Sequence, residues 1–253
     1  MNMQRVMLFF VSLLLFVSCW EGGTNKESGY AIGVVRTDDN LKNVLDVSEY
    51  ESFYSILFAN TNEGACLQVY YELDYDAPEN SYDNIVANGY YTVTIIDKFE
   101  LDRFEMAYNI TDTTKTLVDE IAIQEPIMSG DFAYVKGMGF FYSVLEIPAE
   151  QKMMWHLSCD LQNMVTEENG QRYYDVFLRS TVYQSSSKSS ENTAVLNAYN
   201  MKYFIEMVAR EVKSLDQSSF KLRFNYVSDI KDEIPIWSHQ ETSDISVDYI
   251  IFD

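Results

Sequence analysis

The sequence predicts an antiparallel all-β protein built from many short strands. Apolar and polar residues alternate in segment after segment; in "CLQVYYEL" (66–73), Leu67, Val69, Tyr71 and Leu73 share one face. This period of two is typical of half-buried strands, and the 19 tyrosines and 15 phenylalanines suit such strands. Only one segment has helical periodicity, so we expect barrels or sandwiches without crossover helices.

The first 18 residues are expected to be a lipoprotein signal peptide. Arg5 is their one charged residue, and an apolar run over 6–17 follows it, too short for a membrane span of about 20 residues. The run ends in "FVSC", which resembles the bacterial lipobox and implies that Cys19 is lipidated and becomes the mature N-terminus. A plain signal peptide with an unmodified cysteine is the alternative.

Residues 19–29 are expected to form a flexible tether, because "GGTNKESG" (22–29) is small and polar. Two or three acyl chains on Cys19 would anchor the protein stably, whereas a single chain anchors only marginally. Trp20 stands where an aspartate tends to hold lipoproteins at the inner membrane. We therefore expect a lipid-anchored outer-membrane protein, periplasmic or surface-exposed.

About ten segments with strand-like composition follow the tether. They are 31–37, 53–59, 66–73, 91–99, 103–109, 140–147, 153–161, 173–183, 220–226 and 245–251. In 91–99 the period of two places Val93, Ile95 and Phe99 on one face, and in 153–161 it does the same for Trp155 and Cys159.

Two breaks and one helix punctuate these strands. "PIMSG" (126–130) is expected to separate a domain over 30–126 from a domain over 131–253, both of ordinary size. "QSSSKSSENT" (184–193) is typical of a polar loop. Over 201–215, apolar residues recur three and four apart, which predicts an amphipathic helix; a strand over 203–208 is the alternative.

The chain is strongly acidic, with a net charge of −21. Loss of residues 1–18 would remove Arg5 and no acid, leaving 17 basic against 39 acidic residues and a charge of −22. This balance argues against nucleic acid and against electrostatic binding to anionic lipid. It permits a cationic partner, although a soluble envelope protein kept apart by like charges is the simpler interpretation.

No motif for catalysis, cofactor or metal is found. The chain has two histidines, His156 and His239, no H-E-x-x-H, no phosphate-binding glycine loop and no G-x-S-x-G elbow. We expect His156 to be a surface residue. Cys66 is expected to face outward in one domain and Cys159 to face the core of the other, so no disulfide should join them. We expect no enzyme, no cofactor and no metal.

Three weaker signals remain open. Carboxylates in the acidic loop "ELDYDAPENSYDN" (72–84) could bind calcium, but the loop lacks the EF-hand pattern and a solvated loop is the simpler alternative. Adjacent tyrosines at 70–71, 90–91 and 173–174 should place one ring of each pair outward, where it could stack on a sugar. "DTT" (112–114) resembles a bacterial O-glycosylation site, with Thr113 as the acceptor.

Four segments give the chain a resemblance to the NigD-like lipoproteins. They are "GYAIGVV" soon after the tether, "GYYTVTIIDKFE", "YYDVFLRSTVYQ" with its Leu178-Arg179 pair, and "FKLRFNY". The resemblance implies an N-terminal OB-like β-barrel over 30–126 followed by an antiparallel β-sandwich over 131–253. The family name implies a link with bacteriocin immunity, and the resemblance assigns no role to any single residue.

The sequence therefore predicts a non-enzymatic cell-envelope lipoprotein that binds a protein or peptide, as in bacteriocin immunity. A surface glycan-binding or adhesive β-sandwich lipoprotein is the alternative. A hydrolase using two carboxylates is disfavoured, because 39 acids make any such pair unspecific.

Overall fold

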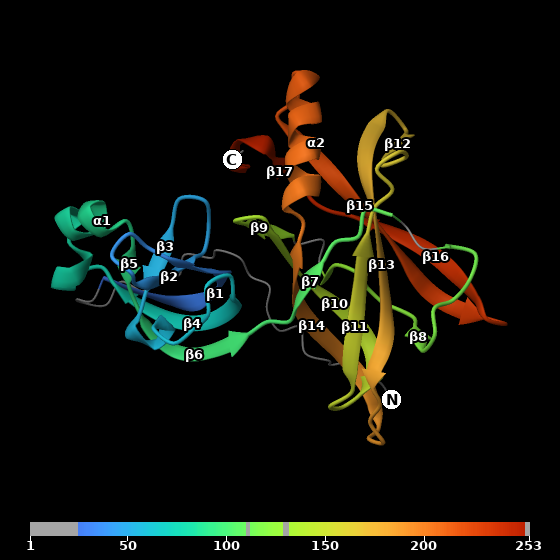
Figure 1. Ribbon diagram of the computed structural model, residues 1–253, viewed down its shortest axis with the longest axis horizontal. Coiled ribbons are helices and arrows are strands. Elements are labelled where there is room, and N and C mark those ends of the chain that lie inside the picture. Colours follow the sequence, from blue (N-terminus) through green and yellow to red (C-terminus); the bar gives the residue numbers. More distant parts are fainter. Residues whose placement is uncertain (1–24, 110–111, 129–131, 251–253) are drawn as a thin grey trace, which may run out of the picture.

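The computed structural model describes residues 25–109, 112–128 and 132–250 of the chain. Strands dominate this part and form two β domains that lie side by side (Figure 1). The predicted all-β fold is confirmed. The predicted leader and its Cys19 lie outside the described residues.

The N-terminal domain is a curled six-stranded sheet in the order β5-β3-β2-β1-β4-β6. β5 and β6 lie on either side of Val93 in one continuous segment, and β5 pairs with β3 while β6 pairs with β4. The two ends of the row are therefore joined, which closes the sheet into a barrel. The strands are β1 (Lys26–Thr37), β2 (Asn43–Asp46), β3 (Ser52–Tyr54), β4 (Cys66–Asp74), β5 (Tyr91–Thr92) and β6 (Thr94–Glu100).

Short helices fill the barrel loops: η1 (Ile56–Phe58), η2 (Pro78–Asn80) and α1 (Tyr82–Asn88). Alternation along β4 sorts its side chains as predicted, because Leu67, Val69, Tyr71 and Leu73 are all buried in the barrel core. On β1, Gly33 allows the close approach of β2, since a Cβ there would lie 2.2 Å from the Asp46 carbonyl oxygen.

The C-terminal domain is a sandwich of two sheets. The smaller sheet has the order β7-β14-β10-β9, and the larger is built on β11-β13-β15-β16, with β8, β12 and β17 at its margins. Most neighbours are antiparallel, but β13 and β15 are parallel because the chain crosses over through β14 and α2 between them. The elements are β7 (Arg103–Glu105), β8 (Glu120–Ile121), β9 (Ala133–Val135), β10 (Met138–Pro148), β11 (Lys152–Ser158), β12 (Val165–Glu168), β13 (Gln171–Gln184), β14 (Ser190–Asn200), α2 (Lys202–Ser214), β15 (Ser219–Lys231), β16 (Ile234–Glu241), β17 (Ile245–Ser246) and η4 (Val247–Tyr249).

The predicted amphipathic helix is confirmed as α2, and the alternative strand over 203–208 is wrong. Phe204, Ile205, Val208 and Val212 are fully buried and belong to the same core as both sandwich sheets. No helix among the described residues combines the length and apolarity that a membrane span requires.

The domain boundaries differ from those expected. β1 begins at Lys26, inside the predicted tether 19–29, because residues 26–29 pair with the end of β4. The barrel sheet ends at Glu100, and β7 already belongs to the sandwich, so the chain changes domain at 101–102 rather than at 126–130. Ile123 and Ile127, around the supposed break, are fully buried in the sandwich core.

Three local predictions are also wrong in part. The segment 53–59 is a strand only to Tyr54 and then turns into η1, and the described part of 245–251, which ends at 250, is a strand only over β17 before η4. The polar loop 184–193 is shorter than expected, because β13 runs to Gln184 and β14 starts at Ser190.

Candidate functional site

The outer face of the barrel packs against the outer face of the smaller sandwich sheet, and this contact is called the junction. From the barrel come Ile32, Val34 and Cys66, and from the sandwich Phe140 and Ala198; they form one apolar cluster together with their neighbours. The junction buries side chains that alternation alone places outside the barrel.

Polar contacts tie the two domains around this apolar centre. Gln68 Nε2 donates to the Tyr142 hydroxyl at 2.6 Å, and Arg103 Nη1 donates to the Gly64 carbonyl at 2.9 Å. Lys136 Nζ lies 2.9 Å from Glu49. Contacts from three different loops and strands fix the domains relative to each other.

An exposed aromatic surface begins where the junction ends. In the register of the barrel sheet, Tyr30 on β1 lies opposite Tyr70 on β4, which lies opposite Asp97 on β6, and Phe99 follows two positions further along. These four residues are called the tyrosine face. Tyr30 is 71% exposed and Phe99 is 52% exposed. The rings of Tyr30 and Tyr70 have centroids 4.9 Å apart, as expected for a directly opposed cross-strand pair.

A β-bulge places Phe99 and Asp97 on this outer surface. The β4–β6 register shifts between Tyr70 and Tyr71, so that Ile95 keeps facing the core but the residues after Ile96 change sides. Phe99 was expected to share the face of Ile95, and that expectation is wrong. The prediction assumed uninterrupted alternation along 91–99, and nothing in that segment of the sequence marks the bulge.

Carboxylates accompany the aromatic rings. Asp97 Oδ1 accepts the backbone N–H of Lys98 at 2.8 Å, and no cation of the described chain forms an ion pair with its carboxylate. Further along the same face, Glu72 is bonded to Lys26 at 3.0 Å. On the sandwich side of the junction, Glu146 is exposed and shares the strand face of Tyr142. The tyrosine face therefore combines ring faces with negative charge, an arrangement suited to a lysine or arginine side chain.

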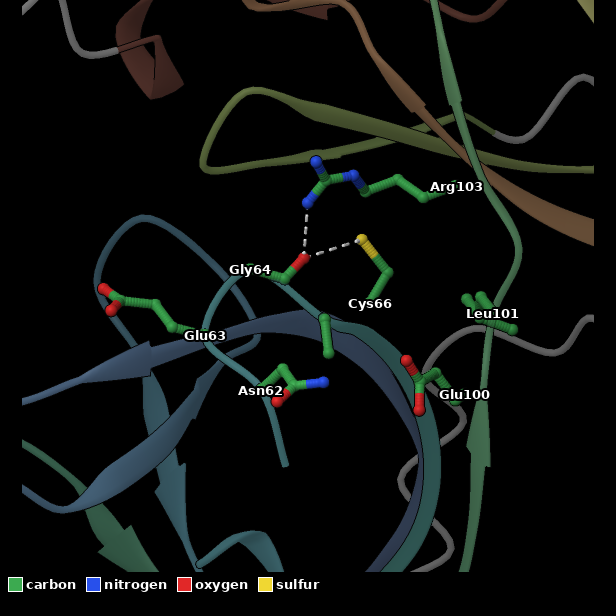
Figure 2. A pocket seen from close by; sticks show the side chains of 8 residues that line it. Asn62, Glu63, Gly64, Cys66, Glu100, Leu101 and Arg103 are labelled. Carbon is green, nitrogen blue, oxygen red and sulfur yellow. Dashed lines mark hydrogen bonds between the residues drawn. The ribbon is translucent and has the colours of Figure 1, made fainter. Parts of the chain in front are cut away.

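A small hollow opens on the flank of the junction, and Figure 2 shows it around Gly64. Its volume is about 240 Å³, below the roughly 300–1,000 Å³ of typical small-molecule sites. Arg103 and Cys66 both donate to the Gly64 carbonyl, and Glu63 and Glu100 line the opening. The hollow is polar, open and shallow.

The thiol in this hollow is not suited to nucleophilic chemistry. Cys66 is 1% exposed, and burial raises the pKa of its thiol to about 11, so it stays protonated at neutral pH. The Cys66 side chain lies on the outer face of the barrel, as predicted, but the sandwich domain covers it. Cys159 lies in the sandwich core, where burial raises the pKa of its thiol to about 12. Both are free, which confirms the prediction that they are not bonded.

A buried ion pair lies at the Leu178-Arg179 pair of β13. The Arg179 guanidinium donates to both carboxylate oxygens of Glu120 at 2.6 Å, and the two side chains are 3% and 0% exposed. Arg179 also donates to the carbonyls of Asp112 and Lys115 and lies 5.5 Å from the Trp237 ring centre. This arginine holds the segment 112–120 against the sandwich, and nothing in the local sequence around Glu120 indicated its partner.

The turn so held contains the predicted glycosylation residue. Thr113 is half-buried, and its carbonyl accepts the indole N–H of Trp237 at 2.9 Å. Asp112 accepts from both the backbone N–H and the hydroxyl of Thr114. Glycosylation of Thr113 stays a prediction.

The other sequence candidates have structural partners. In the acidic loop, Asn80 is buried and bonds to the backbone of Asp74 and Thr92, and Asp74 lies 3.4 Å from Lys26. Within 25–109, 112–128 and 132–250, no three metal-ligating side chains gather into a group. His156 is exposed and lies 3.2 Å from the Thr181 hydroxyl.

The adjacent tyrosines follow the prediction in two pairs of three. Tyr71 and Tyr90 are buried while their neighbours Tyr70 and Tyr91 are only partly buried, as alternation requires. Tyr173 and Tyr174 are both buried, so the prediction fails there. Of these residues only Tyr70 belongs to the tyrosine face.

A family comparison agrees with the barrel geometry. Residues 23–99 match the model of the lipoprotein OB domain family, and the matched segment coincides with the closed barrel. The N-terminal domain is therefore similar to the lipoprotein OB domain family. The predicted lipoprotein with an OB-like N-terminal domain is thereby confirmed.

Solved structures from Parabacteroides and Bacteroides species have a similar fold over most of the chain. An uncharacterised protein from Parabacteroides merdae superposes with a TM-score of 0.74 at 16% identity, covering 86% of this chain and 98% of the other. A protein from Bacteroides fragilis, provisionally assigned as a lipoprotein, has a TM-score of 0.53 at 9% identity and coverages of 85% and 97%. These identities show the fold alone.

A NigD-like immunity protein from Bacteroides caccae is also among the similar structures, with 12% identity, coverages of 84% and 91%, and a TM-score of 0.42. The predicted resemblance to bacterial lipoproteins of this type is confirmed by the match of residues 23–99 to the lipoprotein OB domain and by the Bacteroides fragilis structure, and no argument rests on the structure with a TM-score of 0.42. No curated protein matches the sequence.

Proposed function

We propose that this lipoprotein is a non-enzymatic component of the bacterial cell envelope that binds a cationic polypeptide, as a bacteriocin-immunity protein would. The match of residues 23–99 to a lipoprotein OB domain supports a membrane-anchored lipoprotein. The outer membrane and Cys19 as its lipidated residue are part of the proposal.

The observation that carries the proposal is an exposed aromatic surface held in place by the junction. Two domains fixed at the junction present the tyrosine face to solvent, while the Gly64 hollow is too small to enclose a metabolite-sized ligand. Exposed aromatic surfaces that adjoin an interface are typical of polypeptide binding.

Charge selects the class of partner. A protein of net charge −21 attracts cations over long range and repels acidic partners. The unpaired carboxylate of Asp97 within the tyrosine face adds a local preference for lysine or arginine. Cationic antimicrobial peptides have this chemistry.

A titration tests the proposal. The mature chain without its acylated cysteine (residues 20–253) is titrated against labelled 12-residue peptides of net charge +4, 0 and −4, read by fluorescence anisotropy. We expect the +4 peptide to bind most tightly and the −4 peptide most weakly. The +4 peptide should also bind more weakly in 0.5 M salt, because salt screens electrostatic attraction. Equal affinity across the series, or no binding at all, contradicts the proposal.

A glycan ligand is the alternative, since the exposed ring of Tyr30 could also stack on a sugar. A glycan array probed with the same protein distinguishes the two. Strong glycan binding without peptide binding would favour the alternative.

The anchor is tested separately in cells. Cys19→Ala should abolish palmitate labelling and release the protein from the membrane fraction. Outer-membrane placement predicts that the parent protein co-fractionates with outer-membrane markers after density centrifugation. A Cys19→Ala variant that stays in the membrane pellet would contradict lipidation at this residue.

A further inference from the structure

We propose that the tyrosine face is the recognition site and that it takes an extended cationic segment, whose lysine or arginine side chains lie over the aromatic rings and against the Asp97 carboxylate. This inference rests on the proposed function and names its site and its partner chemistry. The occupant is a segment of a partner polypeptide.

The three strands place these groups within reach of one extended segment. Tyr30, Tyr70 and Asp97 stand opposite one another across β1, β4 and β6. Phe99 pairs with Gln68 on β4, and Gln68 pairs with Ile32 on β1. This row lies two residues along the strands from the row of Tyr30, Tyr70 and Asp97. Neighbouring strands lie about 4.8 Å apart, so the four side chains span about the width of an extended peptide.

The site is preorganised by contacts on both sides. Gln68, beside the tyrosine face, is held by the Tyr142 hydroxyl at 2.6 Å, and Ile32 next to it is packed into the junction. Asp97 is oriented by the Lys98 backbone N–H at 2.8 Å, which leaves its second oxygen for a ligand. Because the Asp97 carboxylate is already oriented and its strands are held at the junction, ordering them on binding costs little conformational entropy.

Charge complementarity supports a cation rather than a neutral side chain. Lys26, at the start of β1, is already bonded to Glu72 and Asp74. Lys98 points elsewhere, because its ammonium donates to the Leu57 carbonyl and the Thr61 hydroxyl. The aromatic rings and Asp97 thus form a cation site that no lysine or arginine within 25–109, 112–128 and 132–250 is shown to occupy.

The same contacts argue that the segment lies across the face and does not extend the sheet. β6 is the last strand in the row, and strand addition there would need free backbone groups. The backbone N–H of Lys98 is taken by Asp97, and its side chain crosses to the η1 loop. We therefore expect recognition through side chains.

Single substitutions of exposed residues test the site. The probe is the labelled 12-residue peptide of net charge +4, measured against the mature chain at low and high salt. Tyr30→Ala and Phe99→Ala should each weaken binding about three- to tenfold, because each removes one ring of a surface cation–π contact. Asp97→Asn should weaken it by a similar factor and also reduce its salt dependence.

Matched controls separate loss of recognition from loss of structure. Tyr30→Phe keeps the ring and should keep the affinity. Tyr183→Ala removes an equally exposed tyrosine, also 71% accessible, from the sandwich strand β13 and should change nothing. Protection of the buried Cys66 thiol reports that the junction is intact in every variant.

The outcomes distinguish the site from the function. If the parent binds the +4 peptide and the three variants bind it equally well, the tyrosine face is not the site, while the proposed function stands. If the parent does not bind the peptide, the proposed function itself fails. Equal losses in Tyr30→Ala and Tyr183→Ala would also overturn the site.

Discussion

Substitution of Arg179 by methionine should destabilise the sandwich severely. Methionine fills similar volume but donates no hydrogen bond, so the Glu120 carboxylate, 0% exposed, would be left buried without its cation. Two backbone carbonyls, those of Asp112 and Lys115, would lose their donors at the same time.

The structure sets the size of the effect. Removing one partner of a buried ion pair costs about 3–5 kcal/mol, since an uncompensated charge remains. Two unsatisfied carbonyls add about 1 kcal/mol each if water does not replace the guanidinium. One Glu120 oxygen keeps the Leu117 N–H at 2.8 Å, which moderates the loss. We expect a decrease of at least about 3–5 kcal/mol in the free energy of unfolding.

Urea titration followed by tryptophan fluorescence measures this change. Trp237 is a built-in probe, because its ring lies against Arg179 and its N–H donates to the Thr113 carbonyl. Lys188→Met is the matched control: it breaks the exposed Lys188–Glu150 pair, and such pairs contribute about 0–1 kcal/mol. A loss below about 1 kcal/mol for Arg179→Met would refute the reasoning, as would equal losses for the two variants.

Three further predictions follow from backbone and thiol positions. Stability should fall as pH rises from about 9 towards 11, because the thiol pKa values of Cys66 and Cys159 are raised by burial in the folded state and the unfolded chain releases these protons first; urea titrations across this range measure it. Gly33→Ala should cost at least about 1–3 kcal/mol in a urea titration, because its Cβ would meet the Asp46 carbonyl oxygen at 2.2 Å. Limited proteolysis of the mature chain should cut first at 185–189, the short connection between two long strands, as mass spectrometry of the fragments would show.

Each of these has its own control. A Cys66→Ala/Cys159→Ala protein should lose less stability between pH 9 and 11 than the parent; an equal slope contradicts the assignment to thiols. Gly29→Ala, on the same strand as Gly33, meets only Tyr71 at 3.9 Å and should be nearly neutral. Early cleavage within 123–128 instead of 185–189 would contradict the burial of Ile123 and Ile127.

The local sequence pattern was sufficient to predict the buried face of an element that packs against a single core. The alternation in 66–73 predicted the buried face of β4, and spacings of three and four over 201–215 predicted the buried face of α2. These predictions hold because burial on one side imposes a period of two on a strand and about 3.6 on a helix, whatever the partner is.

The sequence pattern gave a wrong prediction where the burial of a residue depends on another element of the fold. "PIMSG" has the composition of a linker, yet its Ile127 lies in the sandwich core, because proline and glycine mark a turn without marking which domain surrounds it. Cys66 has an outward position on its strand but is buried, because a second domain covers that part of the barrel.

The sequence by itself determined the all-β class, the helix and the lipoprotein resemblance, since all three are written in neighbouring residues. Only the tertiary structure decided the candidate site. A one-residue bulge in β6 turns Phe99 and Asp97 to the outside, and pairing of β1 with β4 places Tyr30 opposite Tyr70. Residues so far apart in the chain meet only through strand register, and register depends on the partner strand as well as on a strand's own sequence.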